Sequence, residues 1–126
     1  KGAPIFTDTE FVDFVNSNAL SALVDVGHMN LNGYDYEFVV SALGNRIKAF
    51  HIHNNDGVSD LHDKIARGSF DFVRFAALFK RFTPTADLVF EYIDVPDLTI
   101  DELIADVAWG SDINRKRPTT GVELLF

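Results

Sequence analysis

The sequence predicts an α/β fold built on a parallel sheet, and three observations support this. Short apolar runs at residues 21–27, 46–53 and 87–93 alternate along the chain with segments of helical periodicity. Such alternation is typical of right-handed βαβ units, which return the chain to a parallel strand. The runs are apolar almost throughout, as expected of strands that helices cover. Polar side chains stand at the carboxyl end of each run, where parallel α/β proteins place their active sites.

The composition describes one modest globular domain over residues 1–126. Hydrophobic residues make up 47% and charged residues 24% of the chain, which indicates a folded protein rather than a disordered one. The formal net charge of -8 makes a nucleic-acid partner unexpected, because phosphate contacts need clustered Lys and Arg. The absence of cysteine excludes thiolate zinc sites and fits a reducing compartment, so a cytoplasmic location is expected. No apolar run approaches the ~20 residues of a membrane span, so no membrane partner is expected.

Capping patterns and apolar spacing predict the first two helices. Thr7 and Glu10 form a capping-box pattern, and the apolar residues that follow predict a helix over residues 8–18. After the first strand, Asp35 is placed to cap a second helix, and Gly44 is placed to end it.

The second half of the chain continues the alternation. Residues 54–69 form a long polar loop after the second strand, and such a loop is usually functional or mobile. A strongly aromatic helix is predicted over residues 70–82, its Phe stripe packed on the sheet. A capping box at Thr99 opens a last helix that ends near Gly110, and residues 111–126 form a tail whose structure the sequence does not define.

Side chains that bind metals gather at the ends of the three apolar runs. Asp25 and His28 follow the first, His51 and His53 end the second, and Glu91 lies in the third. Carboxylates and imidazoles are ligands for Zn, Mn, Co or Mg. Because the carboxyl ends of parallel strands meet at one edge of a sheet, we expect one metal centre there.

Each of these residues also has a structural interpretation. Asp25 can cap the following turn, and a lone inward histidine is more often a hydrogen-bonded core residue. Asp60 and His62, taken alone, are typical solvated loop residues. Glu91 is the strongest single signal, because a carboxylate within an apolar strand is costly unless it is paired or binds a metal. His51 and His53 are two residues apart and point to the same side of a strand, which favours a site.

Five motifs together resemble the xylose isomerase-like TIM barrels, which include sugar (phosphate) isomerases and epimerases and the endonuclease IV type of AP endonuclease (AP endonuclease family 2). The motifs are Asp25-Val-Gly-His28, His51-Ile-His-Asn-Asn-Asp-Gly57, Asp60-Leu-His62, Gly68-Ser-Phe-Asp71 and Phe90-Glu91. The resemblance covers roughly residues 5–110 and matches strands five to seven of the barrel. It implies a partial (β/α)8 TIM barrel with its helices and a parallel sheet.

The resemblance also implies roles for individual residues. Its expected ligands for a divalent ion (Mn, Zn, Co or Mg) are Asp25, His51 and Glu91. In the endonuclease branch His28 is expected to be a further ligand, and Asp60 and His62 to hold an additional metal. Glu91 is expected to act in catalysis by moving a proton, and His28 by holding a sugar oxygen. The expected substrate-binding residues are His53, Asn55 and Arg67.

Three departures from the family pattern stand out. Ala66 occupies a position that is often Gly in the family, and Asn54 one that is often Asp. The family's other metal-binding Glu comes from strand four, and the sequence shows no strand before Thr7. The first half of the barrel and strand eight are expected to be absent, which makes the chain a C-terminal half-barrel fragment.

Three functions remain open. The leading one is a metal-dependent isomerase or epimerase that acts on a sugar or sugar phosphate. The alternatives are endonuclease IV-like phosphodiester hydrolysis, which the ligand set permits and the acidity opposes, and a catalytically silent half-barrel. A half-barrel exposes two strand edges and an apolar inner face, so we expect a homo-oligomer with little or no isomerase activity of its own.

Overall fold

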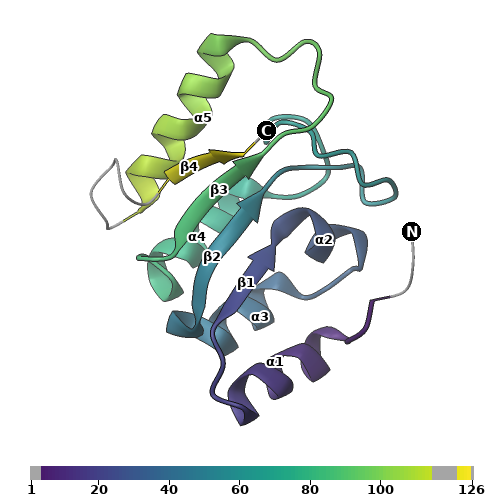
Figure 1. The fold of residues 1–126 in the computed structure, drawn as a ribbon, viewed down its shortest axis with the longest axis vertical. Helices are drawn as coiled ribbons and strands as arrows, with labels where there is room; N and C mark the ends of the chain where they lie inside the picture. The colour runs from purple at the N-terminus through teal and green to yellow at the C-terminus, as the bar shows by residue number, and fades with distance from the viewer. Residues whose placement is uncertain (1–3, 115–121, 126) are drawn as a thin grey trace.

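The structure is a computed structural model that describes residues 4–114 and 122–125. Its centre is a four-stranded sheet with the order β1-β2-β3-β4, in which every neighbouring pair is parallel (Figure 1). The strands are β1 (Ala22–Asp25), β2 (Ile47–Ile52), β3 (Asp87–Glu91) and β4 (Val122–Leu125). The order follows the order along the chain, as in a sheet built from successive βαβ units.

The fourth strand corrects the sequence analysis, which predicted three strands and no strand eight. Strand β4 lies in the tail over residues 111–126 and pairs with β3, with Leu88 opposite Val122 and Glu91 opposite Leu125. Four residues are too short a run for hydrophobic periodicity to distinguish a strand from an apolar chain end.

Helices α3 and α4 lie behind the strands in Figure 1, with α1 and α5 flanking them. The helices are α1 (Asp8–Ser17), α2 (Val26–Leu31), α3 (Tyr36–Leu43), α4 (Phe72–Phe82) and α5 (Ile100–Ile113), with a 3-10 turn at Gly44–Arg46. Along this layer α1 packs on α3, α3 on α4, and α4 on α5. In the described parts of the chain, every helix is too short or too polar to cross a membrane.

The predicted helix boundaries are largely confirmed because caps are local signals. Thr7 and Thr99 each form a complete capping box, and Asp35 caps α3, which ends at Leu43 with Gly44 as its C-cap. Helix α5, however, continues past Gly110 to Ile113.

The first strand is shorter than predicted, because the chain enters α2 directly after it. Asp25 ends β1 and caps α2, its Oδ1 accepting a hydrogen bond from the backbone N–H of His28 at 2.9 Å. Gly27 and His28 therefore lie in a helix rather than in the expected turn.

The core lies between the sheet and α4, and it is largely aromatic. Phe50 of β2 meets Phe75 of α4 edge to face, with ring centroids 5.1 Å apart. Phe79 and Phe90 are also buried in this layer, and the ring of Phe90 lies beside that of Trp109 on α5. The predicted packing of the Phe stripe on the sheet is confirmed.

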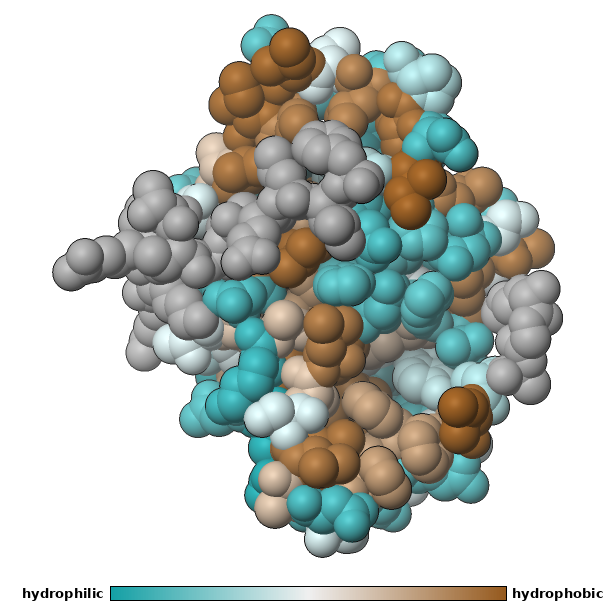
Figure 2. All heavy atoms as spheres, in the orientation of Figure 1, coloured by the Kyte–Doolittle hydropathy of each residue, from teal (hydrophilic) through white to brown (hydrophobic). Residues whose placement is uncertain are grey.

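On the opposite face of the sheet, the polar side chains at the strand ends lie beside some exposed apolar surface. Figure 2 shows hydrophobic areas above and below a hydrophilic area on this face. Within the described residues β1 pairs with β2 alone, so its other edge has no strand beside it. Leu23 on β1 is 53% exposed.

Candidate metal centre

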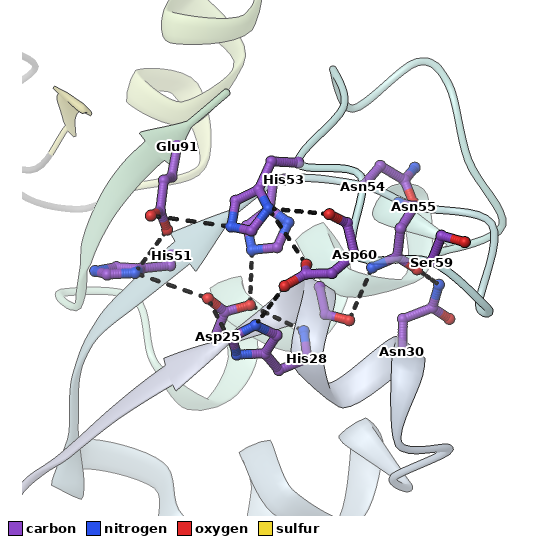
Figure 3. A network of polar contacts seen from close by, with 12 residues as sticks. Asp25, His28, Asn30, His51, His53, Asn54, Asn55, Ser59, Asp60 and Glu91 are labelled. Atoms are coloured by element: carbon purple, nitrogen blue, oxygen red, sulfur yellow. Dashed lines mark hydrogen bonds and ion pairs between the residues drawn. The ribbon is translucent and has the colours of Figure 1, made fainter. Parts of the chain in front are cut away.

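Three neighbouring strand ends bring together Asp25, His51 and Glu91. Asp25 of β1 lies opposite His51 of β2, and Glu91 ends β3. The Nδ1 atom of His51 is 3.0 Å from Oε2 of Glu91 and 3.8 Å from Oδ2 of Asp25 (Figure 3). One ligand atom from each residue lies within 4.8 Å of the others. The structure thus gathers three of the side chains that the sequence analysis singled out, and we call them the strand-end group.

A second group lies beside the first and draws on the long loop. His53, at the end of β2, and the loop residues Asp60 and His62 also offer ligand atoms within 4.8 Å of one another. The imidazole rings of His53 and His62 stack with centroids 4.0 Å apart. Glu91 joins the two groups, because its Oε1 lies 3.9 Å from Nε2 of His62. We call this second set the loop group.

His28 lies at the border of both groups. Its Nε2 atom is 3.2 Å from Oδ2 of Asp60, and its Nδ1 atom is 3.6 Å from Oδ2 of Asp25. The side chain projects from α2 and is 52% exposed. Its ring can therefore meet a bound molecule as well as the neighbouring carboxylates.

Hydrogen bonds hold the Asp25 carboxylate in one orientation. Its Oδ1 atom accepts from Nε2 of His53 at 2.7 Å and from the backbone N–H of His28 at 2.9 Å. Burial raises the pKa of Asp25, but these hydrogen bonds outweigh burial and the pKa lies below its ordinary value. Asp25 therefore carries a negative charge, and its Oδ2 atom faces the imidazoles of His28 and His51.

His53 is fully buried, which differs from the predicted contact with substrate. Because the Asp25 carboxylate only accepts, Nε2 of His53 donates to it, and Nδ1 is the other nitrogen of the ring. Among the described residues, this buried Nδ1 atom has no hydrogen-bond partner. A side chain on Gly27 would not fit, because a Cβ there would lie 2.0 Å from Cε1 of His53. The absence of a side chain at Gly27 therefore makes room for the imidazole of His53.

Asn55, another expected substrate contact, is also fully buried. Its Nδ2 atom donates to the carbonyl of Gly27 at 2.9 Å, and its Oδ1 atom accepts from Asn30 at 2.7 Å. Arg67, the third expected contact, donates to the carboxylates of Asp63 and Asp97. In the structure both side chains are thus held by partners within the chain.

Asn54, which in the sequence stands out only as a departure from the family pattern, supports the loop. Its Oδ1 atom accepts from the backbone N–H of Phe70 at 3.1 Å, and its Nδ2 atom donates to the carbonyl of Ile65 at 3.0 Å. An Asp could not make the second bond, because a carboxylate does not donate. Gly68 allows this packing, since a Cβ there would lie 2.2 Å from the Asn54 Oδ1 atom.

The donor chemistry of the two groups fits a divalent cation. Within the described chain, the ion-pair partners of Asp25, Asp60 and Glu91 are all histidines, and none is Lys or Arg. Several carboxylates held this close repel one another unless positive charge lies between them. Imidazole nitrogens and carboxylate oxygens suit Zn, Mn or Co, and a site richer in oxygen suits Mg. Either group could hold such an ion, and the unpartnered Nδ1 of His53 is consistent with this.

Comparison with known proteins agrees with this geometry. Residues 9–112 match the family described as "Xylose isomerase-like TIM barrel". The chain belongs to this family. The match covers β1 to β3 and all the residues of both groups. The family is largely enzymatic and often binds metals.

A curated relative carries no assigned activity. The chain is 36% identical over 66 residues to "Uncharacterized protein MJ1311" of Methanocaldococcus jannaschii. The aligned part covers 51% of this chain and 22% of that protein. No solved structure matches the chain.

Proposed function

We propose that the protein is a metal-dependent isomerase or epimerase for a sugar or sugar phosphate, with the strand-end group as its cation site. The observation that carries the proposal is the convergence of Asp25, His51 and Glu91 at adjacent strand ends of a xylose isomerase-like barrel. The alignment spans only 22% of the relative's length. The proposed activity is therefore that of a full-length protein of this family, to which the chain contributes this site.

The two carboxylates of the strand-end group are suited to different tasks. Asp25 has one oxygen occupied by hydrogen bonds from His53 and from the backbone of His28, so it is held rigidly and suited to binding. Among the described residues, the ion-pair partners of the Glu91 carboxylate are His51 and His62. Its carboxylate is therefore the better candidate for moving a proton.

The proposed reaction begins with the removal of one proton from the carbon beside the carbonyl of the substrate. A bound divalent cation would polarise the carbonyl and hydroxyl oxygens of the substrate. Glu91 accepts the proton from the carbon beside the carbonyl, and the electron pair of that C–H bond enters an enediolate. Delivery of this proton to the former carbonyl carbon, together with transfer of the hydroxyl proton between the two substrate oxygens, gives the isomer. Protonation of the original carbon on its opposite face by a second acid, with the abstracted proton left on Glu91 and then released to solvent, gives the epimer. His28, half exposed at the border of the site, holds a substrate hydroxyl.

Solvent exchange tests the first half of this reaction and needs only one base. The metal-stripped chain is reloaded with Mn, Co, Zn or Mg and incubated in deuterium oxide with aldoses, ketoses and their phosphates. Nuclear magnetic resonance should show deuterium entering the carbon beside the carbonyl. Glu91→Gln should abolish this, whereas Glu37→Gln, on the outer side of α3, should leave it unchanged. Exchange that persists in Glu91→Gln would refute the assigned proton transfer.

Endonuclease IV-like hydrolysis of a phosphodiester is the second candidate. It is supported by the loop group, because two neighbouring cation sites can stabilise the attacking and leaving oxygens. The net negative charge of the chain opposes this candidate. The ion pairs of the basic side chains near the site oppose it as well. Lys64 contacts Glu102 and Arg67 contacts Asp63 and Asp97, so both are neutralised by carboxylates rather than free to grip phosphates. Metal-dependent cleavage of DNA with an abasic site, without deuterium exchange into sugars, would favour this candidate.

A further inference from the structure

The loop over residues 54–69 holds two site residues in a backbone conformation that needs support. His62 has a φ of 49°, in the left-handed region that residues with a side chain rarely adopt. Such conformations persist where the surrounding structure imposes them, and they cluster at functional sites. The neighbouring residue, Asp63, pairs with the backbone of Asn54 through two hydrogen bonds of 2.8 and 2.9 Å. The carbonyl of His62 accepts a hydrogen bond from Ile93 at 3.1 Å.

Arg67 closes this loop against the segment that follows β3. Its Nε and Nη2 atoms donate to the two carboxylate oxygens of Asp63 at 2.7 and 2.9 Å. Its Nη1 and Nη2 atoms donate to the two oxygens of Asp97 at 2.6 and 2.8 Å. Four of the five N–H donors of the guanidinium are therefore used in two paired contacts, a geometry that lysine cannot reproduce.

The bridge joins parts of the chain that would otherwise repel. Asp63 and Asp97 are both negative, and the guanidinium lies between them. Its hydrogen bonds hold the pKa of Asp97 well below its usual range. Lys64 adds a parallel tie, since its Nζ atom lies 2.9 Å from both carboxylate oxygens of Glu102 on α5. These contacts leave the loop attached to the body of the domain next to the site.

We propose that Arg67 is a positioning residue for the loop group. Its bridge from Asp63 to Asp97 holds the backbone at His62. The bridge thereby keeps the side chains of Asp60 and His62 beside His53. The inference rests on the proposed function in that the protein binds divalent cations, and it goes further by requiring a cation at the loop group beside the one at the strand-end group. In this role Arg67 does not contact the substrate, which differs from the substrate contact expected from the sequence.

Cobalt binding tests this role in the full chain. Metal-stripped protein is titrated with Co²⁺ while its visible absorption and the heat of binding are followed. The Co²⁺ binding event whose affinity falls in Asp60→Asn is assigned to the loop group. Arg67→Met should weaken the same event at least tenfold and leave the strand-end event within twofold. Arg67→Lys should recover part of the loss, because it restores the charge but not the paired contacts.

Arg74→Met is the matched control. Arg74 is 49% exposed against 47% for Arg67, and it makes its own ion pair with Glu37, away from the loop. It should leave both events unchanged. Equal weakening of both binding events in Arg67→Met would indicate general destabilisation and overturn the proposal. Unchanged affinity in both events would also overturn it.

Hydrogen exchange separates this inference from the proposed function. In metal-free protein, Arg67→Met should speed exchange of the Asp63 and Ile93 amides about tenfold, with the amides of β2 unaffected. A wild-type chain that binds no cobalt would refute the cation site and with it the proposed function. Unchanged exchange at Asp63 and Ile93 would refute the positioning role of Arg67, whatever the metal result.

Discussion

Nε2 of His53 lies 2.7 Å from Oδ1 of Asp25, so a fully buried histidine orients the carboxylate that ends the first strand. The same carboxylate caps α2 through the backbone N–H of His28 and faces His51. Asp25 therefore contacts three residues of the site. Hydrogen bonds of this kind fix the direction of a ligand oxygen before an ion arrives. The relationship depends on close packing between His53 and Gly27.

Replacing Gly27 by Ala should disturb this packing. The added Cβ would lie 2.0 Å from Cε1 of His53, and a buried ring cannot move aside freely. We expect a loss of about 1–3 kcal/mol in the free energy of unfolding, measured by urea denaturation, together with weaker cation binding. Gly33→Ala is the control, because no described atom lies within 4 Å of its Cβ and the cost there is that of a φ of 65° alone. Loss of stability in both variants without a change in cation affinity would argue against the link to the site.

Asp25→Asn should separate the cap from the ligand. Asparagine caps helices about as well as aspartate, so we expect a stability change below about 1 kcal/mol. The neutral amide is a poor ligand for a divalent cation, and affinity should fall at least about tenfold. Asp35→Asn changes an equivalent cap on α3, away from the site, and should leave affinity unchanged. Isothermal titration with Mn²⁺ or Co²⁺ measures the difference, and equal affinities would contradict the assignment of Asp25.

Phe79→Ala should strongly destabilise the fold. Phe79 is fully buried, with its ring centroid 5.8 Å from that of Phe50 and 6.0 Å from that of Phe75. Truncation of such a side chain leaves a cavity and costs about 3–5 kcal/mol. Val73→Ala on the same helix is the control, because Val73 is exposed and its truncation should change stability by less than about 0.5 kcal/mol. Thermal and urea unfolding should rank the two variants in this order.

The features that the sequence predicted best are those with local causes. A capping box needs residues three positions apart, so Thr7 and Thr99 identified helix starts correctly. The convergence at strand ends followed from the parallel order of the sheet and needed no distance information. The two-residue spacing of His51 and His53 correctly placed both rings on the side of Asp25.

The features that were missed depend on length or on distant partners. Helix α2 has six residues, which is less than two turns and too short for a periodic pattern. The bridge of Arg67 spans 30 positions to reach Asp97, and charge spacing along the chain does not reveal such a pair. The buried Asn55 likewise has a distant partner, since its Oδ1 atom accepts a hydrogen bond from Asn30, 25 positions away. Polar residues in a loop indicate a site, but their partners decide which of them support it and which face the substrate.

The bridge between Arg67 and Asp97 should make stability depend on pH in acid. Hydrogen bonds from Arg67 hold the pKa of Asp97 below its ordinary value of 3.8, and so favour the charged form in the folded state. A lowered folded-state pKa contributes stability above the unfolded value, and this stability is lost as the pH falls through the folded pKa. The stability difference between wild type and Asp97→Asn should therefore be constant near neutrality and should narrow below pH 3.8.

Urea unfolding midpoints measured from about pH 6 to about pH 2.5 test this dependence. Asp13→Asn, at an exposed position on α1, controls for the change in net charge. Because Asp97 is exposed, its effect should also shrink in about 1 M salt, where the screening length falls to about 3 Å. A difference from wild type that widens toward low pH would mean that the Asp97 carboxylate is not held in its charged form by Arg67, and the bridge would lose its assigned role.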